Sequence, residues 1–177
     1  MEEKIIAAGF GGQGALSIGQ FIAYSALEEN LEVTWLPSYG PEMRGGTANC
    51  SVVVSDKPVA SPIIATPDCL IAMNKPSLAK FVNDVKPGGL IIVNSSLIED
   101  KVEREDVRVA YVDANAIALQ AGNARTANIV ILGAYIKLSG LLPHDTVFKT
   151  IDKIFAKKPK VIPVNKKAFE LGYAIEI

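Results

Sequence analysis

The stretch Lys4-Ile-Ile-Ala-Ala-Gly9-Phe-Gly-Gly-Gln-Gly14 joins a short apolar run to a glycine-rich turn. The apolar run predicts a buried strand over residues 4–8, and the mainly apolar segment after the turn predicts a helix over 15–27. A second strand is expected over 32–36, which completes a strand–turn–helix–strand unit of about thirty residues, the size of a βαβ unit. Gly9, Gly11 and Gly14 fit G-x-G-x-x-G between the strand and the helix.

The alternation of strands and helices continues along the chain. The expected strands cover 48–55, 68–73, 90–93 and 107–112, and the expected helices cover 76–85, 114–122, 127–139 and 143–156, with Asp113 and Thr126 as caps. Residues 159–177 have no clear pattern. This alternation predicts an α/β fold: one Rossmann-like, three-layer domain over residues 1–177, with a mainly parallel sheet and helices on both faces.

Composition and charge restrict the function classes. The chain has 177 residues, of which 49% are hydrophobic and 21% charged, so we expect a folded core rather than disorder. With 18 Lys and Arg against 19 Asp and Glu, nucleic acid is not expected as a partner. The acidic start and the lack of an apolar run of about 20 residues predict neither a signal peptide nor a membrane partner, hence a cytoplasmic protein. The lysine-rich region after Asp145 is interpreted as a solvated helix face.

The two cysteines and the single histidine limit metal chemistry. Cys50 and Cys69 fall in apolar strand segments and are predicted to be small core residues, and His144 is assigned no chemistry. An iron–sulfur cluster or a structural zinc needs about four Cys or His ligands, so the chain by itself is expected to hold neither. We therefore predict no metal site and no catalytic residue, and any redox chemistry would need an organic cofactor or another subunit.

The glycine turn is the first candidate binding site. Its glycines allow a phosphate to approach backbone N–H groups at the helix start, which makes candidates of Gly9, Gly11, Gly12, Gln13 and Gly14. A dinucleotide site also needs an acid at the end of the second strand to bind the ribose, and the segment Val33-Thr-Trp-Leu-Pro37 has none. NAD is therefore disfavoured, while another phosphate-bearing ligand and a purely structural turn both stay open.

The loop Ser38-Tyr-Gly-Pro-Glu-Met-Arg-Gly-Gly-Thr47 is the second candidate. In a parallel sheet it lies at the same edge as the glycine turn, and irregular loops of this length are often functional. Arg44 can bind a phosphate or carboxylate through two parallel hydrogen bonds, and Tyr39 offers a flat ring and a hydroxyl. The alternative is a docking loop in which Glu42 and Arg44 pair with each other or with another subunit.

The helix that begins at residue 127 is the third candidate. Its segment 129–136 is apolar almost all round, which predicts burial on every side. It is either a central core helix or a helix partly exposed on the monomer and covered by a partner. Asn128 in its first turn is either a ligand contact or a capping residue.

Three segments together resemble one known family: Gly9–Gly14, Trp35-Leu-Pro-Ser-Tyr-Gly-Pro-Glu-Met-Arg-Gly-Gly-Thr-Ala-Asn-Cys50, and Asn128-Ile-Val-Ile-Leu-Gly-Ala134. They are similar to the gamma subunit of the 2-oxoacid:ferredoxin oxidoreductases, within the pyruvate/ketoisovalerate oxidoreductase family, over about residues 5–142. The form Tyr39-Gly-Pro-Glu-Met-Arg-Gly-Gly-Thr47 resembles the 2-oxoglutarate and branched-chain 2-oxoacid members more than the pyruvate members.

The resemblance implies a non-autonomous subunit of an enzyme that oxidatively decarboxylates a 2-oxoacid, with 2-oxoglutarate expected, to an acyl-CoA. Electrons would pass to ferredoxin through the complex. Alpha and beta subunits, and a delta subunit where there is one, would hold thiamine diphosphate and the iron–sulfur clusters, while Gly11–Gly14 and Arg44 here would contact coenzyme A. Two alternatives are a freestanding nucleotide- or phosphate-binding module and the equivalent subunit of an indolepyruvate oxidoreductase.

Overall fold

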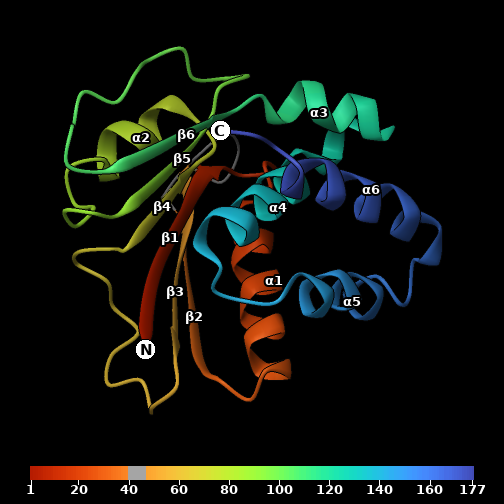
Figure 1. Cartoon of the computed structure of the whole chain (residues 1–177), viewed down its shortest axis with the longest axis horizontal. Coiled ribbons are helices and arrows are strands. Elements are labelled where there is room, and N and C mark those ends of the chain that lie inside the picture. The colour runs from red at the N-terminus through yellow and green to blue at the C-terminus, as the bar shows by residue number, and fades with distance from the viewer. Residues whose placement is uncertain (40–46) are drawn as a thin grey trace.

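The computed structural model describes residues 1–39 and 47–177, which form a sheet flanked by helices (Figure 1). The strands are β1 (Glu2–Phe10), β2 (Glu32–Tyr39), β3 (Thr47–Ser55), β4 (Cys69–Ala72), β5 (Leu90–Asn94) and β6 (Arg108–Val112). The helices are α1 (Ala15–Glu28), α2 (Lys75–Phe81), α3 (Ala114–Ala121), α4 (Ala127–Ser139), α5 (His144–Ile154) and α6 (Ile162–Tyr173), with 3-10 turns at Ala124–Thr126 and Pro159–Val161. The region after residue 159, unassigned from the sequence, therefore contains a helix.

The strand order in the sheet is β2-β3-β1-β4-β5-β6. Strands β1, β4, β5 and β6 pair in parallel, whereas β3 pairs antiparallel with both β1 and β2. The predicted α/β fold with a mainly parallel sheet is confirmed. One detail differs from a parallel βαβ unit: β1 and β2, which α1 connects, run in the same direction but are not neighbours, because β3 lies between them. Two neighbouring strands joined by a short connection must be antiparallel, so β3 pairs antiparallel with β2 and fills the position between β2 and β1.

The outer strand β2 is longer than expected. The strand expected over residues 32–36 continues to Tyr39. Pro37 lies opposite Cys50 of β3, and among the described strands β2 is an edge strand with β3 as its one neighbour. Proline is tolerated on such an edge strand, where half of the backbone N–H groups have no partner strand.

Helices lie on both faces of the sheet, as predicted, but in unequal numbers. Figure 1 shows α2 on one side and α1, α4, α5 and α6 on the other. Along β1 the side chains alternate between the two layers: Ile5 belongs to the core cluster under α1 and α4, and Ile6 to the cluster under α2. No helix in the described part of the chain is long and apolar enough to cross a membrane.

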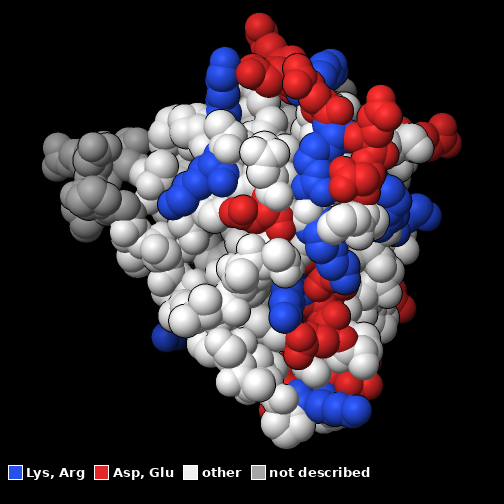
Figure 2. All heavy atoms as spheres, turned by 90° about the vertical axis from the view of Figure 1, so that its left-hand side faces the viewer, with Lys and Arg blue, Asp and Glu red and all other residues white. Residues whose placement is uncertain are grey.

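The α2 side of the molecule carries charges of both signs. Figure 2 shows Lys and Arg side chains interleaved with Asp and Glu in a band along this face. Two of the pairs are Lys75 with Asp100, at 3.3 Å, and Arg104 with Asp106, at 2.7 Å. Because neighbouring charges of opposite sign offset one another, this face presents no extended positive surface.

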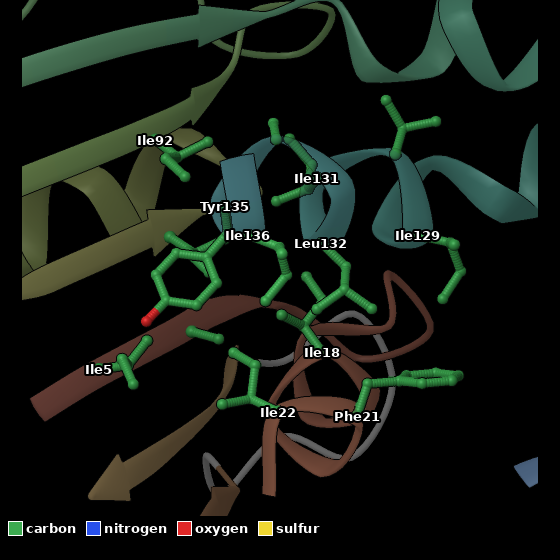
Figure 3. Close-up of a cluster of buried hydrophobic side chains, with 14 of the residues drawn as sticks. Ile5, Ile18, Phe21, Ile22, Ile92, Ile129, Ile131, Leu132, Tyr135 and Ile136 are labelled. Carbon is green, nitrogen blue, oxygen red and sulfur yellow. The ribbon is translucent and has the colours of Figure 1, made fainter. Parts of the chain in front are cut away.

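The apolar segment of helix α4 is buried within the chain. Every residue from Ile129 to Ile136 is buried, and Figure 3 shows Ile129, Leu132 and Tyr135 facing α1 and the sheet. On its other side α4 packs against α6, where Gly133 lies next to the backbone of Phe169. The prediction of a central core helix is confirmed, and the alternative of a partner-covered helix is wrong, because α6 supplies the cover.

Asp113 and Thr126 occupy the N-cap positions of α3 and α4, as expected, but neither side chain makes a capping hydrogen bond. The hydroxyl of Thr126 donates to the carbonyl of Asn123 at 2.7 Å and does not cap α4. Asp113 precedes α3, but its carboxylate accepts a hydrogen bond from Ser96. The Ser96 hydroxyl in turn accepts the backbone N–H of Asn115 at 3.0 Å. Ser96 therefore accepts a backbone N–H at the start of α3, and because it lies far from this helix in the sequence, no local sequence pattern predicts the contact.

Candidate functional site

The candidate site lies at the edge of the sheet where the parallel strands end. Gly9 of β1 pairs with Ala48 of β3, and Ala48 pairs with Tyr39 of β2. Tyr39 is therefore two strand spacings, about 10 Å, from the glycine turn along the sheet. Its side chain is 66% exposed. The structure thus brings Tyr39 to the same edge as the glycine turn, as predicted.

The glycine turn is closed by its own glutamine. The backbone N–H of Gln13 donates to the carbonyl of Phe10 at 3.2 Å, and the Gln13 side-chain oxygen accepts the Phe10 N–H at 2.6 Å. Gly12 and Gly14 adopt φ values of +88° and +80°, which favour glycine. Gln13 therefore shapes the turn, a role that the sequence pattern did not reveal.

The glycines of the turn differ in what surrounds them. A Cβ on Gly9 would lie 2.9 Å from the Cβ of Met73, and a Cβ on Gly14 would collide with the side chain of Asn128. Among residues 1–39 and 47–177, a Cβ on Gly11 or Gly12 would meet no atom within 4 Å. The backbone at Gly11 and Gly12 is thus open to a ligand, whereas Gly9 and Gly14 are needed for close packing.

Asn128 joins the start of α4 to the start of α1. It is half-buried, and its side-chain nitrogen donates to the carbonyl of Gly14 at 3.5 Å. Asn128 lies inside the first turn of α4, after the capping position at Thr126, so the capping interpretation is wrong. Its role as a ligand contact stays a prediction.

Arg44 and Glu42 fall outside the described residues. The two interpretations of their loop, ligand contact and docking, both stay predictions. The described end of β2, Ser38 and Tyr39, carries no acid that could bind a ribose. Because β3 separates β1 from β2, that strand end also lies farther from the glycine turn than in a sheet where the two are neighbours.

A groove that sequence reasoning missed opens beside Asn128. It has a volume of about 310 Å³ and lies between α1, the start of α4, the end of α5 and the start of α6. Arg125 and Lys158 are among its lining residues. The positive charge around residue 158 is the sequence signal for this groove, and the interpretation of the lysine-rich region as a solvated face does not reveal it.

Both cysteines are core residues, as predicted. Cys50 lies fully buried beneath α1, and its thiol donates to the carbonyl of Ala15 at 3.6 Å. Burial raises the pKa of Cys50 to about 11 and the pKa of Cys69 well above its usual value. Both thiols are therefore protonated near neutral pH and unsuited to nucleophilic chemistry. Within residues 1–39 and 47–177, no three His, Cys, Asp or Glu side chains gather into a metal-ligand group.

His144 fastens α5 to α6, away from the glycine turn. Its Nε2 lies 2.7 Å from Glu170 Oε1 and its Nδ1 lies 3.0 Å from Asp145 Oδ1, while the ring stacks on Phe148. Burial lowers the pKa of His144, but the hydrogen bonds to Asp145 and Glu170 outweigh burial and raise the pKa above 6.5. The residue has a structural role here.

Known proteins share both the sequence and the fold. Residues 4–175 match the family model described as Pyruvate ferredoxin/flavodoxin oxidoreductase. The chain belongs to this family. A gamma subunit of a keto/oxoacid ferredoxin oxidoreductase from Geobacter sulfurreducens has a similar structure, with a TM-score of 0.82 and 29% identity, over 97% of this chain and 96% of that one. The resemblance to the gamma subunits is thereby confirmed.

Two longer proteins also match. Ketoisovalerate oxidoreductase subunit VorA of Methanothermobacter thermautotrophicus is 43% identical over 173 residues, which cover 97% of this chain but 36% of VorA. The 2-oxoglutarate:ferredoxin oxidoreductase from Magnetococcus marinus, solved with 2-oxoglutarate, coenzyme A and succinyl-CoA bound, has a TM-score of 0.89 and 27% identity. The match covers 98% of this chain and 30% of that one. This chain therefore spans about a third of these two relatives.

Proposed function

We propose that the chain is the gamma subunit of a multi-subunit 2-oxoacid:ferredoxin oxidoreductase, which oxidatively decarboxylates a 2-oxoacid to an acyl-CoA. The family match over residues 4–175 carries this proposal, supported by the nearly complete mutual coverage with the Geobacter gamma subunit. Alpha and beta subunits, with a delta subunit where one exists, hold thiamine diphosphate and the iron–sulfur clusters. The isolated chain is therefore inactive.

In this proposal the glycine turn contacts coenzyme A. The backbone at Gly11 and Gly12 fits the approach of a phosphate, because no atom of the described residues occupies the space beside either residue. Coenzyme A carries several phosphates and suits an anion site made of backbone N–H groups. Tyr39 and Asn128 flank the turn, and Arg44 supplies a positive charge. Coenzyme A was bound in the related Magnetococcus structure, which supports the assignment.

The substrate expected from the loop sequence is 2-oxoglutarate. A branched-chain 2-oxoacid is the second candidate, and the 43% identity with the ketoisovalerate subunit VorA favours it. The Magnetococcus enzyme, with 2-oxoglutarate bound, shares 27% identity with this chain. An aryl 2-oxoacid such as indolepyruvate is a third substrate to assay.

The proposal is tested by purifying the tagged chain from its native cells. The eluate is assayed for viologen reduction with 2-oxoglutarate, ketoisovalerate, pyruvate or indolepyruvate, each with and without coenzyme A. We expect larger subunits to co-elute and dye reduction to depend on both the 2-oxoacid and coenzyme A. A chain that elutes alone and without activity would favour the freestanding nucleotide-binding module instead.

A further inference from the structure

The groove beside Asn128 combines a positively charged rim with an apolar floor. Its volume of about 310 Å³ lies within the range of small-molecule sites. Arg125 comes from the turn before α4, and Lys158 from the connection between α5 and α6. Phe155 and Phe21 form part of the floor, with ring centroids 5.8 Å apart. A site of this kind accepts a ligand that is flat at one end and anionic at the other.

The positive charges of the rim are not neutralised by the residues around them. None of the described residues that line the groove is Asp or Glu. Within residues 1–39 and 47–177, the ion pairs include neither Arg125 nor Lys158. The backbone N–H of Arg125 donates to Asn123 Oδ1 at 2.9 Å, which holds the turn that carries the guanidinium. Two such cations on one groove attract a multiply charged anion, and guanidinium suits phosphate geometry.

Neutral polar side chains complete the lining. Asn165 of α6 is only 7% exposed, lines the groove, and donates from Nδ2 to the carbonyl of Val161 at 2.8 Å. Gln20 of α1 and Asn128 of α4 add carboxamide groups. Carboxamides both donate and accept hydrogen bonds, as the edge of a nucleobase requires.

We propose that this groove binds a phosphorylated nucleotide, with its base over the Phe155 side of the floor and its phosphate at Arg125 and Lys158. The nucleotide could be free ADP or the nucleotide end of coenzyme A, and the latter source rests on the function proposed above. Asn128 lines the groove and also contacts Gly14. It therefore stands between this groove and the glycine turn.

The test is isothermal titration of the full-length chain with ADP, coenzyme A and inorganic phosphate, at 150 mM salt to screen distant charges. The variants are Arg125→Glu and Lys158→Glu. Lys157→Glu is the matched control, because Lys157 is the adjacent exposed lysine and does not line the groove. We expect each groove variant to weaken nucleotide binding at least tenfold and the control to change it less than twofold. Circular dichroism verifies that all three variants are folded.

Phe155→Ala tests the base separately from the phosphate. It should weaken ADP binding and leave the affinity for inorganic phosphate unchanged. Coenzyme A binding more tightly than ADP would identify coenzyme A as the source, and equal affinities would identify free nucleotides. Either ranking supports the groove as a nucleotide site.

Three results would overturn the proposal. They are no binding of ADP or coenzyme A at millimolar concentration, an equal loss of affinity in Lys157→Glu, and phosphate binding as tightly as ADP. None of these results would affect the oxidoreductase proposal, which depends on co-purified subunits and 2-oxoacid-dependent dye reduction. Conversely, a tagged chain that elutes from its native cells without other subunits and without 2-oxoacid-dependent dye reduction, yet binds ADP through Arg125, would refute the oxidoreductase proposal and leave the nucleotide site standing.

Discussion

The close crossing of α4 and α6 depends on two glycines: Gly133 of α4 lies against the backbone of α6, and Gly172 of α6 lies against the backbone of α4. A Cβ added to Gly172 would lie within 3.0 Å of the carbonyl oxygen and Cα of Val130. A Cβ added to Gly133 would come equally close to the carbonyl of Phe169. Both obstacles are backbone atoms, so no side chain can rotate away. Since carbon and oxygen normally stay about 3.3 Å apart or more, Gly172→Ala must push the two helices apart.

The cost of Gly172→Ala follows from two opposing effects. Inserting a methyl group into a packed core costs about 1–3 kcal/mol. If the two helices also move about 0.5–1 Å apart, each atomic contact between them loses roughly a quarter to a half of its attraction energy. Alanine favours the helix over glycine by about 1 kcal/mol, which offsets part of this loss. Because the obstacles are backbone atoms, we take the insertion cost at the upper end of its range, about 3 kcal/mol; less the helix gain of about 1 kcal/mol, and with the weakened contacts added, the free energy of unfolding should fall by about 2–3 kcal/mol. At about 2–4 °C per kcal/mol, the Tm falls by about 5–10 °C.

Urea and thermal denaturation followed by circular dichroism measure this effect. Gly11→Ala is the control, because a Cβ there meets no atom of the described residues within 4 Å, and its free energy of unfolding should change by less than about 0.5 kcal/mol. A Tm of Gly172→Ala within 1 °C of the wild type would refute the reasoning. It would mean that α6 does not cover α4 at this distance, and that another surface must bury the central helix.

Three further predictions concern titration, thiol reactivity and the loop. His144→Gln should cost more stability at pH 6 than at pH 9, because the folded state raises the pKa of His144. The stabilisation from the raised pKa is present below the unfolded pKa and is lost as the pH rises through the folded pKa. Equal losses of unfolding free energy in urea titrations at both pH values would contradict this prediction. Cys50 and Cys69 should resist iodoacetamide at pH 8 until the chain is unfolded, because both thiols are buried with raised pKa values; mass spectrometry of the native protein would reveal any labelling. In the assembled complex, Arg44→Ala should raise the KM for coenzyme A or weaken subunit association, and a variant unchanged in both would disprove a role for this residue.

Strands and helices with a strong local pattern could be predicted well. Helix α4 begins and ends at residues 127 and 139, as expected from its apolar run and the glycine after it. Helix α6 was missed, because its buried apolar positions, Ala168, Phe169 and Gly172, are few and follow a pair of lysines. Its covering role depends on the close approach of two backbones, which no pattern in its own sequence expresses.

The candidate site likewise has a part that could be predicted from local sequence and a part that could not. The glycine turn and Tyr39 were placed at one edge because the C-terminal ends of parallel strands meet there. The groove was missed because its residues come from four helices and from the turns before α4 and α6, between Ser17 and Asn165, and each is unremarkable in its own segment. Gln13 was named as a ligand contact, yet its side-chain oxygen is used to close the turn.

The sequence alone determined the fold class, most of the elements, the turn between β1 and α1, and the family resemblance. Each of these depends on the spacing of residues within one segment, where backbone hydrogen bonds and side-chain periodicity act over a few positions. The position of β3 between β1 and β2, the cover of α4 by α6 and the groove around Arg125 depend on contacts between distant segments. Such contacts are selected by how whole surfaces pack, so they became visible only once the chain was folded.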